Sequence, residues 1–138
     1  MIEQLKQDLV KDEGWIRYAY LDSLSYWTIG CGILIDQRNG GGLRDEEIDF
    51  ILDNRIRLVV EELSTRWPPF QACPEPVQRA LCNMAYQMGV GGLLRFQKAL
   101  AAIEAGDYEE GADEMLRSRY AVQTPARAAR VSALIREG

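Results

Sequence analysis

The chain has 138 residues, 47% of them hydrophobic, which suits one globular domain with a sizeable core and excludes a disordered chain. Its net charge of −5 argues against nucleic acid as a partner. Histidine is absent, and the three cysteines, Cys31, Cys73 and Cys82, lack the spacing of a metal site. The sequence therefore predicts free thiols, no metal and no cofactor.

Charge and hydropathy are unevenly distributed along the chain. Residues 1–63 carry 7 basic and 13 acidic side chains, whereas the last 22 residues carry 5 basic and 1 acidic. No apolar run has the length of a membrane-spanning helix, so we expect no stable membrane association. The N-terminus has no basic region followed by an apolar one, so we expect no secretory signal.

The first element predicted is a short amphipathic helix over residues 2–12, because Ile2, Leu5 and Leu9 recur at helical spacing. Gly14 supplies the residue that commonly ends a helix, which leaves Glu13 at the last turn. Negative charge is disfavoured at a helix C-terminus, so a carboxyl group there has a reason to keep its proton. A general acid needs this property, although an ordinary surface carboxylate would fit the same position.

Three short strands follow. Residues 17–21 and 27–29 are rich in β-formers, and the composition of residues 22–25 between them predicts a turn. Residues 30–35 suggest a third strand, in which two glycines permit close approach of a sugar ring. Three consecutive glycines at 40–42 predict a flexible loop.

The rest of the chain has helical periodicity. A long helix is predicted from Asp45 to about Trp67, where two prolines end it, and a second begins near Pro74 and closes at Gly89 to Gly92. The buried positions expected on this second helix are Ala80, Leu81, Met84, Ala85 and Met88. Three more helices are predicted over residues 93–105, over residues 107–120 with an Asp N-cap, and from Pro125 onward.

The residues most suggestive of chemistry are Glu13, Asp22 and Thr28. Glycoside hydrolysis needs two carboxyl groups facing one bond, one as acid and one as base or nucleophile. A carboxyl group at a helix end and another on the hairpin that follows would meet that need, and the Thr28 hydroxyl could hold a water beside the second. Two acids at this spacing are common by chance, so the flanking residues decide the interpretation.

Those flanking residues resemble the phage-type lysozymes, the endolysin muramidases of the T-even type. The N-terminal part of the resemblance consists of Glu13-Gly14, Tyr20, Asp22, Thr28-Ile29-Gly30 and Gly32. Residues 83–89 resemble the family's central-helix signature, and Ser118-Arg119-Tyr120, Gln123-Thr124-Pro125, Arg127 and Arg130-Val131 its C-terminal one. The motifs occur in the family's order and cover nearly the whole chain, with an N-terminal lobe that looks shortened.

The resemblance implies an α+β, lysozyme-like fold in one domain, residues 1–138. It implies a β-hairpin lobe over residues 13–44 and a connecting helix over residues 45–67. A mostly helical lobe would comprise residues 1–12 and 68–138, with the active-site cleft between the two lobes.

The resemblance also implies roles for individual residues. Glu13 would be the general acid, Asp22 the base in an inverting reaction, and Thr28 the residue that helps to hold the attacking water. Arg127 matches an arginine that pairs with the glutamate and orients it. Leu34, Tyr86 and Gln87 match residues that line the cleft and bind substrate, although core packing is an equal alternative for Tyr86.

The implied activity is hydrolysis of the β-1,4 bond between N-acetylmuramic acid and N-acetylglucosamine in peptidoglycan, causing host-cell lysis. The enzyme would be a monomer in the cytoplasm of the host bacterium. It would reach the cell wall after a holin-type partner permeabilises the membrane. Two alternatives are a catalytically weak or silent peptidoglycan-binding domain and a chitin or chitosan hydrolase.

Overall fold

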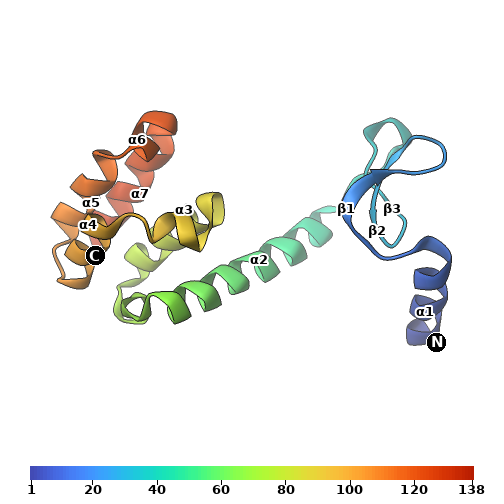
Figure 1. Cartoon of the computed structure of the whole chain (residues 1–138), viewed down its shortest axis with the longest axis horizontal. Helices are drawn as coiled ribbons and strands as arrows, with labels where there is room; N and C mark the ends of the chain where they lie inside the picture. The colour runs from blue at the N-terminus through green and yellow to red at the C-terminus, as the bar shows by residue number, and fades with distance from the viewer. The chain divides into compact units, whose positions relative to one another are not determined.

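The structure, a computed structural model, describes all residues 1–138 and contains two compact units, Met1–Phe50 and Ile51–Gly138 (Figure 1). Helices dominate, and the one sheet has three antiparallel strands, so the predicted α+β class is confirmed. None of the helices combines the length and the hydropathy needed to cross a membrane.

The boundary between the units falls inside helix α2 (Asp45–Arg66), after Phe50. The first unit includes residues 1–12, which the sequence analysis grouped with the helical lobe. That grouping, like the cleft between the lobes, stays a prediction.

The first unit begins with helix α1 (Ile2–Glu13). Gly14 ends it with a φ of 86°, a backbone conformation that glycine adopts at little cost, and its N–H donates to the Val10 carbonyl at 2.9 Å. The predicted helix and its glycine stop are therefore confirmed, with Glu13 as the last helical residue.

The sheet of the first unit has the order β1 (Ile16–Leu21), β2 (Trp27–Gly30), β3 (Ile33–Leu34). Strand β2 is central, and its Thr28 lies opposite Tyr20 on one side and Leu34 on the other. The predicted third strand is shorter than residues 30–35, because Gly30 and Gly32 adopt positive φ values of 68° and 66° and make the turn between β2 and β3.

The glycine segment after β3 is not the open flexible loop predicted. A 3-10 turn, η1 (Gln37–Asn39), leads back so that the Gly41 N–H donates to the Asp36 carbonyl and the Gly42 N–H to the Leu34 carbonyl, both at 3.0 Å. A Cβ on Gly41 would lie 2.7 Å from the Asp36 carbonyl oxygen, so only glycine permits this approach. The loop is a hydrogen-bonded cap on the end of β3.

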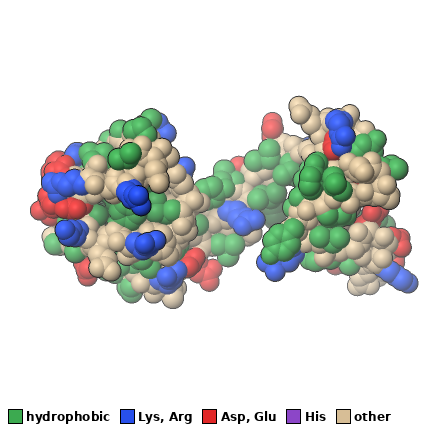
Figure 2. Space-filling view, turned by 45° about the horizontal axis from the view of Figure 1, so that its top comes forward, with side chains coloured by type: hydrophobic (Ala, Val, Ile, Leu, Met, Phe, Trp, Pro, Cys, Tyr) green, Lys and Arg blue, Asp and Glu red, His purple; other side chains and the backbone are tan.

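The interior of the first unit is polar. Thr28 and Asp36, each 4% exposed, are its only buried residues. Apolar side chains reach the surface of both units (Figure 2), and in the first unit they include Trp15, Tyr18 and Leu24. Hydrogen bonds therefore fix the geometry of the sheet where a buried apolar core would otherwise do so.

The second unit is helical. After α2, the two prolines end the helix as predicted and begin a 3-10 turn. The elements that follow are η2 (Pro68–Ala72), α3 (Glu75–Leu93), α4 (Gln97–Glu104), α5 (Tyr108–Leu116), α6 (Arg119–Gln123) and α7 (Pro125–Glu137).

Most of the predicted helices are found, with three differences. Gly89 has the non-helical φ of 80° and ψ of 156° and interrupts α3 where the sequence placed its end, but a further helical turn follows and runs to Leu93. Helix α4 begins at Gln97, because the preceding residues form a turn in which the Phe96 N–H donates to the Leu93 carbonyl. The helix predicted over residues 107–120 is two helices, separated where Ser118 is extended and its hydroxyl donates to the Met115 carbonyl.

One hydrophobic core fills the second unit. Of the five buried positions predicted on α3, four are buried and Met88 is partly buried. Residues from every neighbouring helix complete the core, and its fully buried larger side chains are Leu63, Val77, Leu81, Met84, Leu93, Met115, Val131 and Ile135. This core makes α3 a rigid support for the residues on its exposed faces.

Candidate active site

Glu13 is the last residue of α1, with its side chain exposed and directed over the turn between β2 and β3. A Cβ placed on Gly32 would lie 2.6 Å from Glu13 Oε2 and 2.8 Å from its carboxyl carbon. The absence of a side chain at Gly32 thus leaves the space that the Glu13 carboxyl group occupies. The helix end and the glycine turn position this group together.

Asp22 follows β1 and forms the turn predicted over residues 22–25. Its Oδ1 accepts hydrogen bonds from the N–H groups of Leu24 and Tyr26, each at 2.9 Å, and its carbonyl accepts one from Ser25 N–H at 3.0 Å. Ser25 is the one non-glycine residue with a positive φ, at 64°. The turn therefore fixes Asp22 Oδ1 firmly, while Oδ2 accepts none of the hydrogen bonds in the structure.

Thr28 and Leu34 lie opposite each other on β2 and β3. The Thr28 hydroxyl donates to the Tyr26 carbonyl at 3.0 Å, so its lone pairs are available to accept a hydrogen bond. Since the Tyr26 N–H binds Asp22, the same residue contacts both Asp22 and Thr28. The structure thus brings Glu13, Asp22, Thr28 and Leu34 into one three-stranded unit.

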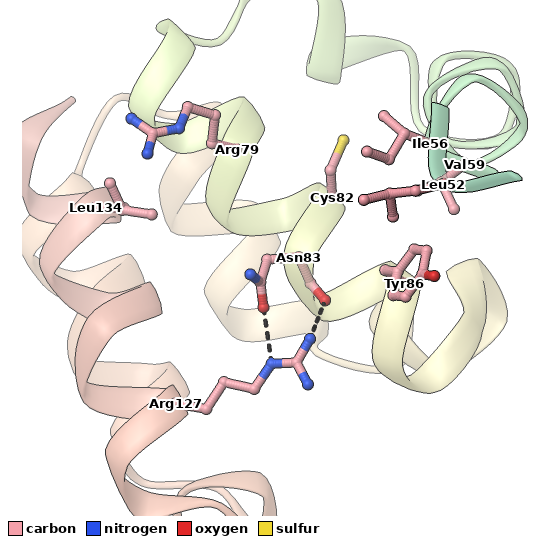
Figure 3. Close-up of a pocket in the computed structure, with 9 residues that line it drawn as sticks. All are labelled: Leu52, Ile56, Val59, Arg79, Cys82, Asn83, Tyr86, Arg127 and Leu134. Atoms are coloured by element: carbon pink, nitrogen blue, oxygen red, sulfur yellow. Dashed lines mark hydrogen bonds between the residues drawn. The ribbon is translucent and has the colours of Figure 1, made fainter. Parts of the chain in front are cut away.

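The remaining predicted site residues lie in the second unit. Tyr86 is 51% exposed on α3 and helps to line a cavity of about 380 Å³ (Figure 3). The cavity is lined by Leu52, Ile56, Val59, Arg79, Cys82, Asn83, Tyr86, Arg127 and Leu134. Tyr86 is therefore a wall residue of a cavity and not a core residue.

Gln87, the next residue on α3, lines a different cavity of about 690 Å³ together with Arg95, Phe96 and Tyr120. Successive residues of a helix point about 100° apart, so neighbours in sequence face different surfaces. The Tyr120 hydroxyl is buried without a hydrogen-bond partner, and burial raises its pKa while the charges of Arg127 and Arg130 act against that rise.

Arg127 reaches from α7 to α3, where it is bound to one residue (Figure 3). Its Nε donates to Asn83 Oδ1 at 2.8 Å, and its Nη2 donates to the Asn83 carbonyl at 3.2 Å. The predicted pairing of Arg127 with Glu13 would join the two units and stays a prediction, as does a shared site for Glu13 and Tyr86.

The sequence analysis missed Asp36 and Arg38. Asp36 Oδ1 accepts from Arg38 Nε at 2.9 Å and Oδ2 from Arg38 Nη2 at 2.7 Å, while Oδ2 also accepts from Trp27 N–H at 3.2 Å. The Asp-Gln-Arg-Asn-Gly run after a strand is a signal for a capped turn, because Asp accepts from the N–H two residues on. Nothing in that run indicates contacts with β2.

The charge of Asp36 is strongly stabilised. Hydrogen bonds from the Arg38 side chain hold the pKa of this carboxyl group well below its usual range, and the N–H groups of Arg38 and Trp27 act in the same direction against the effect of burial. The same pairing raises the pKa of Arg38. Asp36 therefore keeps its negative charge well below neutral pH.

Comparisons with known proteins identify the family of the chain. Residues 10–136 match the family model described as phage lysozyme. The chain is 27% identical over 164 residues to Probable T4-type lysozyme 1 of Dictyostelium discoideum, covering all of this chain and 96% of that protein.

Two further relatives are longer phage proteins. The chain is 31% identical over 155 residues to the Pre-baseplate central spike protein Gp5 of Enterobacteria phage T4, which covers 94% of this chain but 27% of that protein. It is 32% identical over 71 residues to the Peptidoglycan hydrolase gp36 of Enterobacteria phage SP6, covering 46% of this chain and 7% of that protein. Because the family model spans nearly the whole sequence, the chain belongs to the phage lysozyme family of glycoside hydrolases.

Proposed function

We propose that the chain hydrolyses the β-1,4 bond between N-acetylmuramic acid and N-acetylglucosamine in bacterial peptidoglycan, with inversion at the anomeric carbon. The observation that carries the proposal is the polar geometry of the first unit. A helix-terminal carboxyl group over a glycine turn and a hydrogen-bonded aspartate and threonine lie in the same small unit, in a chain of the phage lysozyme family.

In this proposal Glu13 is the general acid. Its side chain is exposed, and its carboxyl group lies against the Gly32 backbone, where a substrate can reach it. Protonation of the glycosidic oxygen by such a group contributes typically about 10²–10⁴-fold to the rate.

Asp22 is the base in the same proposal. Two backbone N–H groups hold its Oδ1, which leaves Oδ2 as the oxygen that takes a proton from the attacking water. The Thr28 hydroxyl donates a hydrogen bond to the Tyr26 carbonyl. It can therefore accept a hydrogen bond from that water and orient it. An inverting reaction needs room for this water between the two carboxyl groups.

In this proposal Leu34, Tyr86 and Gln87 bind substrate, and Arg127 is a supporting residue. Leu34 lies beside Thr28 in the sheet, and the half-exposed ring of Tyr86 suits the apolar face of an aminosugar. The relative named a peptidoglycan hydrolase supports this substrate class. We further propose that the chain acts as a monomer from the host cytoplasm, reaching the cell wall through a holin-type lesion and lysing the cell.

Product analysis tests the proposed reaction. Purified peptidoglycan is digested, the new reducing ends are reduced with borohydride, and the fragments are identified by mass spectrometry beside a chitin oligomer treated in parallel. We expect reduced N-acetylmuramic acid from peptidoglycan and much slower cleavage of chitin. Reduced N-acetylglucosamine, or faster cleavage of chitin, would contradict the proposed bond, and no cleavage of either polymer would indicate a binding domain.

Proton NMR of freshly cleaved ends tests inversion separately. We expect the α anomer first, from a β-linked substrate, with the β anomer appearing only by mutarotation. A β product at the earliest times would make Asp22 a nucleophile, because retention proceeds through a covalent glycosyl-enzyme intermediate.

A further inference from the structure

We infer that Asp36 and Arg38 are positioning residues that hold Asp22 and Thr28 in place for catalysis. The inference rests on the proposed function, because it assigns a role at the same site. It starts from the observation that the two buried residues of the first unit are Thr28 and Asp36, both polar, in a unit without a buried apolar core.

The first contact joins Asp36 to the strand that carries Thr28. Strand β3 ends at Leu34, yet the Ile35 N–H still donates to the Trp27 carbonyl at 2.9 Å. The Trp27 N–H then donates to the Asp36 carboxylate instead of a backbone carbonyl. The side chain of Asp36 thus extends the pairing of β2 and β3 by one hydrogen bond, next to Thr28.

The second contact joins Arg38 to the turn that carries Asp22. Arg38 Nη2 donates to the Ser25 carbonyl at 3.0 Å, and its guanidinium lies over the Tyr26 ring, 5.4 Å from the ring centroid. Ser25 is the turn residue with the positive φ, a conformation that persists only when its surroundings hold it. Tyr26 is the residue whose backbone contacts both Asp22 and Thr28.

One ion pair therefore connects the two catalytic positions. Arg38 holds the turn, Asp36 holds the strand, and the two are bound to each other through both carboxylate oxygens. Such forked pairing fixes orientation as well as distance, which an ammonium group cannot reproduce. Neither residue needs to touch substrate for this role.

The test compares Arg38→Ala, Arg38→Lys and Asp36→Asn with the parent and with Arg44→Ala as matched control. Arg44 is the other arginine of the first unit in an ion pair with a carboxylate, Glu47, at 2.7 Å, and it contacts neither the turn nor β2. The values of kcat and KM are measured on soluble uncrosslinked glycan strands, below the melting temperature of each variant.

We expect Arg38→Ala to lower kcat by about 10- to 100-fold with little change in KM, since misplacement by about 1 Å can cost about 100-fold. Asp36→Asn should lower kcat too, Arg38→Lys should give an intermediate kcat, and Arg44→Ala should match the parent. Arg38→Lys keeps a charge beside Asp36, so it carries the test if Arg38→Ala does not fold. A parental kcat in Arg38→Lys and Asp36→Asn, or a loss confined to KM, would overturn the inference.

Two controls separate this inference from the proposed function. Glu13→Gln is assayed in parallel with the parent. We expect the parent to be active and Glu13→Gln to be inactive. An inactive parent, or an active Glu13→Gln, overturns the proposed function and the inference with it. An active parent with an inactive Glu13→Gln and fully active Arg38 and Asp36 variants overturns the positioning role alone.

Discussion

At the residue scale, glycine at position 32 permits the observed position of the Glu13 side chain as well as the turn. A Cβ there would lie 2.6 Å from Glu13 Oε2, so the carboxyl group would have to move. The N-terminal motif named Gly32 in the sequence analysis, but no spacing in a sequence shows which side chain fills the space above a glycine. This contact depends on the tertiary fold.

Gly32→Ala should therefore remove most of the lytic activity. The new methyl group displaces the Glu13 carboxyl group and strains a φ of 66°. Gly106→Ala is the matched control, because Gly106 has a φ of 80° and open space around its Cβ position. Both variants should lose stability by about 1–2 kcal/mol from the left-handed backbone, and only Gly32→Ala should lose activity in a reducing-end assay. Equal activities in the two variants would show that the Glu13 contact has no catalytic importance.

The Asp36 carboxyl group also has a residue-scale consequence, for stability against acid. Arg38 holds the pKa of Asp36 well below its unfolded value, so the ionised group stabilises the folded state above the unfolded pKa of about 3.9. This stabilisation is lost as the pH falls below that value towards the folded pKa. The groups that face Asp36 are the Arg38 guanidinium and the N–H groups of Arg38 and Trp27, with Tyr26 beside Arg38.

Melting temperatures of the parent and Asp36→Asn between pH 2 and pH 7 check this account. We expect the parent to melt higher by a constant amount between about pH 5 and pH 7, and the difference to shrink as the pH falls below about 3.9. A difference that stays constant down to pH 2 would mean that the charge of Asp36 does not contribute to stability.

At the element scale, the sequence predicted helix ends well where a proline or glycine at the end itself determines the boundary. The prolines at 68 and 125, and Gly14, mark ends that the structure confirms. The predictions were less accurate where tertiary contacts decide. After the break at Gly89, for example, a further helical turn buries Val90 and Leu93 in the core. The loop after β3 was predicted to be flexible from its three glycines. The hydrogen bonds that its Gly41 and Gly42 N–H groups donate to the Asp36 and Leu34 carbonyls leave no pattern in the sequence.

The Asp107 cap is a local end signal that can be measured. Its side chain accepts from the Glu110 N–H at 3.1 Å at the start of α5, as the sequence predicted. Asp107→Ala should lower the free energy of unfolding by about 1 kcal/mol, and Asp107→Asn should retain most of it, because Asn caps helices as well as Asp does. Urea unfolding of the three proteins measures the difference. If both variants lost the same free energy of unfolding, the stabilisation by Asp107 would come from its charge and not from the helix cap.

At the scale of the whole molecule, charge is divided between the two units. The first unit has 10 acidic and 5 basic side chains, and the second has 11 of each. The five arginines of the last 22 residues are partly compensated, since Arg117 pairs with Glu110 and Glu114, and Arg136 with Glu109 and Asp113. Local attraction to anionic cell-wall polymers is therefore weaker than the sequence alone suggests.

The salt dependence of lysis should reflect this balance. The Debye length falls from about 30 Å at 0.01 M to about 10 Å at 0.1 M, so added salt first removes the distant repulsion between like charges. We expect lysis of permeabilised cells to stay level or rise over that range and to fall at higher salt. A steep decline from the lowest salt upward, typical of a basic lysozyme, would show that the local arginines govern encounter with the wall.

The central claim concerns Glu13, and one measurement tests it most directly. Parent and Glu13→Gln are incubated with purified peptidoglycan, and the rate at which new reducing ends appear is compared after both proteins are shown to melt at similar temperatures. The amide is nearly isosteric with the carboxyl group but cannot deliver a proton, so we expect the rate to fall by at least about 10²-fold. A Glu13→Gln rate within a few-fold of the parent's would contradict the assignment of Glu13 as the general acid.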